Sequence, residues 1–128
     1  MTLSHEAEAG TPPATGVARV DAEPGAESAF FGYGMDREDL TGLTVSARVF
    51  AAAGANVRMK VYLQTGDTFA WADSGAFSPT PSTWACIALD VAAPRYQADD
   101  FDPTQVVELG IEIMGEGQLT VYVDDVRY

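Results

Sequence analysis

Residues 56–73 read NVRMKVYLQTGDTFAWAD and predict two β-strands joined by a tight turn at Thr65-Gly66. In the first strand every second residue is apolar: Val57, Met59, Val61 and Leu63. The positions between them hold Arg58, Lys60, Tyr62 and Gln64. Because successive side chains of a strand point to opposite faces, one face is apolar and the other carries cations, a phenol and an amide. A merely solvated face rarely needs that mixture.

The same alternation recurs along the rest of the chain. Residues 43–50, 83–91, 105–114 and 119–124 each place apolar side chains at every second position. Turns rich in Gly, Pro and Ser separate these stretches, and no convincing helix or fixed-period repeat is present. We therefore predict an all-β fold, an antiparallel β-sandwich of seven or eight strands with jelly-roll architecture. Residues 1–128 would form a single domain, with residues 1–16 an irregular arm or first strand.

The overall composition excludes several classes of partner. A net charge of −12 argues against binding nucleic-acid phosphates or an anionic membrane surface. No run of residues is long and apolar enough for a membrane helix.

The first ten residues, MTLSHEAEAG, lack the features of a signal peptide, so we expect either a cytosolic protein or an excised module with an added Met.

Catalysis is poorly supported by the residues available. The single histidine, His5, lies in the N-terminal arm, and no Cys/His cluster or phosphate-binding glycine loop is present. Glu108 and Glu112 share a strand face, but four residues along a strand span about 13 Å, too far for a glycosidase pair. We therefore expect no enzymatic activity.

The register of the hairpin decides what its second strand presents. A two-residue loop at Thr65-Gly66 would form the cross-strand pairs Gln64–Asp67, Tyr62–Phe69, Lys60–Trp71 and Arg58–Asp73. A three-residue loop would shift the register by one and turn Phe69 and Trp71 into the core. The small residues Thr68, Ala70 and Ala72 suit a core face already filled by the first strand, which favours the two-residue loop.

The face created by the two-residue loop suits a carbohydrate. Aromatic rings stack on the apolar face of a pyranose, and amides, carboxylates and guanidinium groups bond its hydroxyls. The candidate binding residues are Arg58, Lys60, Tyr62, Gln64, Phe69, Trp71 and Asp73. A simpler interpretation makes Trp71 a core residue and pairs the two cations with Asp67 and Asp73.

Four segments resemble a known family. In this order, KVYLQTGDTFAWADSG, STWACIALDV, DPTQVVELGIEI and LTVYVDDVRY resemble non-catalytic carbohydrate-binding modules of bacterial plant-cell-wall hydrolases, which have a galactose-binding-domain-like jelly roll. The resemblance covers residues 43–128, and VYVDDV is its most specific part. It implies a secreted accessory domain with Trp71 and Tyr62 as stacking platforms and Arg58, Lys60 and Gln64 as hydrogen-bond donors.

The same resemblance implies a structural calcium ion. Many such modules hold calcium with the closing aspartate and acidic residues near the first strand. Here these positions correspond to Asp125 and to Glu6 or Glu8. The N-terminal third departs from the family pattern, and the simpler interpretation of Glu6 and Glu8 is solvated charge.

Two hypotheses of different kinds follow. In the first, the module binds a β-linked plant cell-wall polysaccharide (glucan, xylan or mannan) and targets an appended glycoside hydrolase to it. In the second, it is a structural domain that packs on a neighbouring catalytic domain and binds no ligand. A small glycan-active enzyme is the least favoured alternative.

Overall fold

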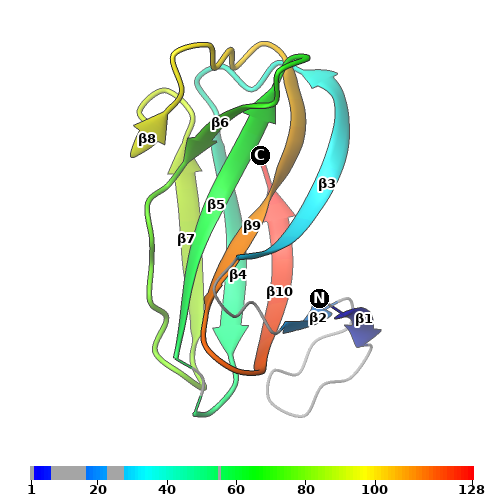
Figure 1. The fold of residues 1–128 in the computed structure, drawn as a ribbon, viewed down its shortest axis with the longest axis vertical. Coiled ribbons are helices and arrows are strands. Elements are labelled where there is room, and N and C mark those ends of the chain that lie inside the picture. Colours follow the sequence, from blue (N-terminus) through cyan, green and yellow to red (C-terminus); the bar gives the residue numbers. More distant parts are fainter. Residues whose placement is uncertain (1, 7–16, 23–27, 55) are drawn as a thin grey trace.

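Two five-stranded antiparallel sheets make up the fold (Figure 1). The computed structural model describes residues 2–6, 17–22, 28–54 and 56–128, with only the backbone described for residues 2–6 and 17. The first sheet has the order β1-β2-β10-β4-β7 and comprises β1 (Thr2–Glu6), β2 (Val17–Ala22), β10 (Leu119–Arg127), β4 (Thr44–Ala51) and β7 (Trp84–Asp90). The second sheet has the order β3-β9-β5-β6-β8 and comprises β3 (Ala29–Glu38), β9 (Val106–Gly115), β5 (Val57–Thr65), β6 (Ala70–Asp73) and β8 (Tyr96–Gln97).

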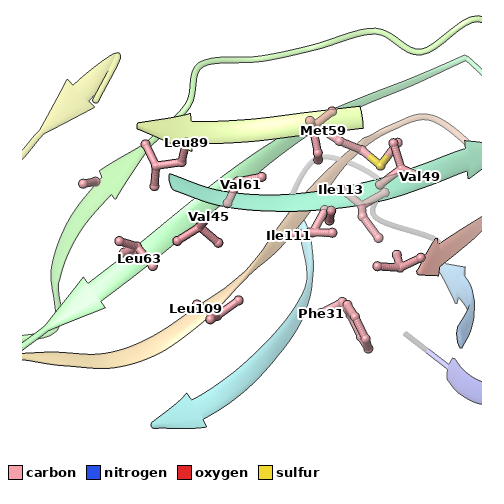
Figure 2. Close-up of a cluster of buried hydrophobic side chains, with 14 of the residues drawn as sticks. Phe31, Val45, Val49, Met59, Val61, Leu63, Leu89, Leu109, Ile111 and Ile113 are labelled. Carbon is pink, nitrogen blue, oxygen red and sulfur yellow. The ribbon is translucent and has the colours of Figure 1, made fainter. Parts of the chain in front are cut away.

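The core lies between the two sheets. The apolar row of β5 is fully buried, as its alternation predicted, and it packs among side chains of β4, β7 and β9 (Figure 2). Because strand side chains alternate, the polar residues of each strand are left on the outer face of its sheet. The sandwich therefore has two outer faces, one per sheet.

The predicted fold class is confirmed, and the number of strands is larger than predicted. The two-residue strand β8 lies between the predicted strands 83–91 and 105–114, where only a connecting turn was predicted, and it pairs with β6. Residues 2–6 form β1 and pair with β2, whereas residues 7–16 lie outside the described part of the chain. Within the described residues no helix is present that is long and apolar enough to cross a membrane.

Candidate functional site

The turn between β5 and β6 is longer than the sequence suggested. Thr65 pairs with Ala70, so the loop spans four residues, 66–69, instead of two. The predicted pairs Gln64–Asp67, Tyr62–Phe69, Lys60–Trp71 and Arg58–Asp73 are therefore wrong, and the observed pairs include Gln64–Trp71 and Tyr62–Asp73. The partner of each β5 residue lies four positions further along the chain than predicted, and an even shift keeps every side chain on its face. Trp71 and Asp73 consequently share the outer face of the second sheet with Tyr62 and Gln64.

Trp71 stacks directly on Tyr62. Their ring centroids lie 4.6 Å apart with an interplanar angle of 7°. Tyr62 is only 1% exposed, whereas Trp71 is half-buried. The prediction that Tyr62 is itself a stacking platform is wrong in this respect, because Trp71 covers it. Tyr62 instead supports Trp71 from below.

Two paired glycines make room for the Tyr62 phenol. Gly32 of β3 lies opposite Gly110 of β9. A Cβ atom on either glycine would come within 2.6 Å of the Tyr62 hydroxyl oxygen. Because real atoms do not approach so closely, any larger residue at these positions would displace Tyr62 and the Trp71 ring above it.

Phe30 completes an aromatic cluster with Tyr62 and Trp71. Its ring meets both others edge-on, with centroids 5.8 Å from Tyr62 and 6.2 Å from Trp71. Edge-to-face contacts of this kind are favourable for aromatic quadrupoles. Phe30 is 44% exposed, so the cluster presents apolar surface on the sheet beside the half-buried Trp71.

Asp73 fixes the orientation of the Trp71 indole. Its carboxylate accepts hydrogen bonds of 2.8 Å from the Trp71 indole N–H and from the Gly75 backbone N–H. Although Asp73 is 3% exposed, it also lies 3.6 Å from the Lys60 ammonium. A buried carboxylate with these three partners is well compensated for its loss of water. Asp73 thus positions Trp71 instead of offering free oxygens to a ligand.

Two glutamates of β9 complete the polar part of the face. Glu112 lies 3.8 Å from the Lys60 ammonium and accepts a hydrogen bond from Ser28. Lys60 therefore bridges Glu112 to Asp73. Glu108 accepts a 2.8 Å hydrogen bond from the Tyr62 hydroxyl. Burial and the adjacent Glu108 carboxylate raise the pKa of the Tyr62 phenol above its ordinary value. Tyr62 is therefore a neutral donor held in place at neutral pH.

An open groove of about 700 Å³ runs beside the aromatic cluster. Side chains from β5, β6, β8, β9 and the adjoining loops line it, among them Arg58, Lys60, Trp71, Asp73, Arg95, Tyr96 and Glu112. Such a groove combines a partly exposed indole with hydrogen-bonding and charged groups. That combination suits a ligand with an apolar face and several hydroxyls.

Besides the covered Tyr62, two predicted binding residues do not line this groove. Phe69 lies in the turn with a positive φ of 53° and is 58% exposed, so it does not stand on the strand beside Tyr62. Gln64 is half-buried on β5, and its side-chain amide lies 3.5 Å from the Phe69 carbonyl oxygen. Asp67 pairs with Arg37 instead of with a cation of β5. Of the expected ion pairs, only Lys60–Asp73 is present.

Five further residues of the face were not among the predicted binding residues. These are Phe30, Arg95, Tyr96, Glu108 and Glu112. The adjacent pair Phe30 and Phe31 carried a usable signal, since neighbouring strand residues face opposite ways and only one of the two could be core. The structure buries Phe31 and exposes Phe30. Arg95 and Tyr96 had no comparable signal, because they lie where the sequence indicated a loop.

The predicted calcium site lies largely outside the described side chains. Both carboxylate oxygens of Asp125 accept hydrogen bonds from Arg127, at 2.8 Å and 2.6 Å. The side chain of Glu6 and all of Glu8 lie outside the described residues. Among the side chains described, no group of three or more His, Cys, Asp or Glu residues could hold a metal ion. Calcium binding therefore stays a prediction from the resemblance alone.

Comparison with known proteins places this geometry in a family. Residues 17–125 match the family described as "Mannanase, galactose-binding domain-like". The match covers most of the chain, including every strand of the second sheet. No curated protein matches the sequence significantly.

Solved carbohydrate-binding modules share the fold. A family 11 module of a cellulosomal cellulase of Clostridium thermocellum has a TM-score of 0.71 at 12% identity, over 98% of this chain and 78% of that one. A family 30 module of another cellulosomal cellulase of that organism gives 0.66 at 11% identity, over 88% of this chain and 73% of that one. A third structure, described as showing promiscuous specificity of β-sandwich carbohydrate-binding modules, has a TM-score of 0.67 at 18% identity. The match includes 98% of this chain and 51% of that chain, so this chain spans about half the length of that one. These similarities establish the β-sandwich fold of such modules.

Proposed function

The chain belongs to the family of mannanase galactose-binding domain-like modules, and we propose that it binds a β-linked plant cell-wall polysaccharide without catalysing its hydrolysis. The binding surface is the outer face of the second sheet, at the aromatic cluster and the groove beside it. In the full-length protein, which we expect to be secreted, the module targets an appended glycoside hydrolase to its substrate.

The position of Trp71 carries this proposal. Its indole is supported on one side by Tyr62 and oriented by Asp73, and it lines an open groove. A ring held in this way loses little conformational freedom when a sugar stacks on it, which favours binding. Among glucan, xylan and mannan, the family description makes β-mannan the first ligand to test.

Catalysis is not supported by the carboxylates of the face. Asp73 and Glu112 are bridged by Lys60, and Glu108 accepts the Tyr62 hydroxyl proton in a hydrogen bond. A glycosidase needs one carboxyl group as an acid and a second as a base or nucleophile facing the same bond. Each of these three groups instead holds a neighbouring side chain in place.

Affinity gel electrophoresis on soluble β-mannan, β-glucan and xylan tests the proposal. The wild-type domain should be retarded by at least one of them. Trp71→Ala should weaken binding by at least about tenfold, as expected for a central aromatic contact. Trp84→Ala, on the outer face of the first sheet, is the matched control and should bind as the wild type does.

The opposite results would support a different function. If no polysaccharide retards the wild-type domain, the proposal is wrong. The aromatic cluster would then fit the alternative, a surface that packs on a neighbouring catalytic domain. That alternative predicts tight binding of the separate domain to its catalytic neighbour, lost in Trp71→Ala.

A further inference from the structure

Positive charge is concentrated at the groove beside Trp71. The chain has 7 basic and 19 acidic residues. Three of the basic residues, Arg58, Lys60 and Arg95, line this groove, together with two carboxylates, those of Asp73 and Glu112. The groove is therefore locally cationic on a strongly acidic protein.

Two of these cations lack a protein partner within the described residues. Elsewhere, Arg37, Arg48 and Arg127 each lie beside an aspartate, and Lys60 lies between Asp73 and Glu112. Arg58 and Arg95 are exposed, and no ion pair or side-chain hydrogen bond is formed by either with any described residue. On a chain with so many carboxylates, both unpaired guanidinium groups occur at one groove.

The backbone holds both arginines at the edges of this groove. The Arg95 backbone N–H donates a 2.9 Å hydrogen bond to the Asp73 carbonyl oxygen. The Arg95 side chain lies over Gly75, where an added Cβ would come within 2.8 Å of its Cγ atom. Arg58 lies on β5 opposite Met114 of β9. Both arginines thus border the surface on which Trp71 is presented.

We propose that this groove selects polysaccharides that carry uronic acid residues, with Arg58 and Arg95 binding the sugar carboxylate. The inference rests on the proposed function, since it names the class of polysaccharide that the same site prefers. A guanidinium group binds a carboxylate through two parallel N–H···O bonds, which gives direction as well as charge attraction. Neutral hydroxyls give no comparable reason to leave two arginines unpaired. The acidic remainder of the surface repels a polyanion, but salt screens that repulsion beyond about 8 Å at physiological ionic strength.

A ligand pair that differs only in charge tests the inference. Binding of the domain to a β-linked xylan bearing glucuronic acid branches is compared with binding to the same preparation after its carboxyls have been reduced to alcohols. The charged form should bind more tightly, and added salt should weaken that preference. Arg58→Gln and Arg95→Gln should each lower affinity for the charged form by about fivefold, a larger loss than either variant causes for the reduced form.

Two further variants separate this inference from the proposed function. Arg48→Gln changes the net charge equally but lies on the other sheet, so it should preserve the preference. Trp71→Ala should weaken binding of both forms. Equal binding of the two forms by the wild type, with Trp71→Ala weakening both, would overturn the uronate preference and leave polysaccharide binding intact. If the wild type binds neither form and none of the neutral polysaccharides, both the uronate preference and the proposed function are overturned.

Discussion

Each sheet carries a cluster of three contacting aromatic rings on its outer face, and the two clusters are built differently. On the first sheet, Tyr122, Phe50 and Trp84 lie in one cross-strand row across β10, β4 and β7. Their rings meet at interplanar angles of 57° and 76°. The Arg48 guanidinium lies over Trp84, 4.7 Å from the ring centroid, and also lies 3.8 Å from the Asp124 carboxylate. The Trp84 ring already has a protein cation on its face.

On the second sheet, the ring contact of the tryptophan comes from beneath it, whereas Trp84 is contacted by a cation over its ring. Tyr62 supports Trp71 from below, Asp73 bonds its indole edge, and two arginines beside it are unpaired within the described residues. We infer from this comparison that clustered aromatic rings alone do not make a ligand platform. A platform also needs support below the ring and free polar groups beside it.

Removing the tyrosine of each cluster should separate the two faces most strongly. Tyr62→Ala should lower the free energy of unfolding by about 3–5 kcal/mol, because it leaves a cavity beneath Trp71. Tyr122→Ala should cost about 1–2 kcal/mol, since Tyr122 is only half-buried. Urea unfolding measures both. Equal losses would show that Tyr62 is not a buried support.

A substitution in the glycine pair beneath Tyr62 should have the next largest effect on stability. Gly110→Ala should destabilise the domain by about 1–3 kcal/mol, because the new Cβ would lie 2.5 Å from the Phe31 carbonyl oxygen and 2.6 Å from the Tyr62 hydroxyl. It should also weaken polysaccharide binding by displacing Trp71. Gly34→Ala on the neighbouring strand meets no atom within 4 Å and is the control. Unchanged binding in Gly110→Ala would argue against the supporting role of Tyr62.

The Tyr62–Glu108 hydrogen bond should make a smaller, pH-dependent contribution. Tyr62→Phe should lower the free energy of unfolding by about 0.5–1.5 kcal/mol at neutral pH. Because the pKa of Tyr62 is raised in the fold, the unfolded chain releases this proton first, at about pH 10. The wild type should therefore lose stability above about pH 10, and the two stability profiles should converge there. Parallel profiles across that range would contradict the assignment, and Tyr122→Phe is the control.

Removal of the Arg48 side chain from the Trp84 ring should have the smallest effect on stability. Arg48→Ala removes a guanidinium–indole contact and an exposed ion pair, for which we expect a loss of about 0.5–1 kcal/mol in urea unfolding. Polysaccharide binding should be unchanged. A marked loss of binding would move the functional face to the first sheet.

The sequence predicted the sandwich and the face of Trp71, while it misjudged the turn. Loops of two and four residues produce the same alternation, because they differ by an even number. What distinguishes them is tertiary: the Gly66 N–H donates to the Gln105 carbonyl oxygen, and the Asp102 N–H donates to the Thr65 hydroxyl. Local patterns contain no information about these partners.

The burial of Tyr62 could not be predicted for a similar reason. Tyr62 lies between Lys60 and Gln64 in a row of residues that face outward, and this pattern predicts an exposed side chain. Its burial depends on Gly32 and Gly110 from two other strands and on Trp71 above it. That Arg58 and Arg95 form no ion pair with a described residue likewise depends on how the other charges pair in three dimensions.

The proposal that ligand binds the outer face of the second sheet can be tested most directly by NMR. The protein has only two tryptophans, one on each outer face, so its two indole N–H signals report on the two faces separately. Assignment by Trp71→Phe, followed by titration with oligosaccharides of the polysaccharide that retards the domain, should shift the Trp71 signal and leave the Trp84 signal in place. A shift of the Trp84 signal with a stationary Trp71 signal would contradict the proposal.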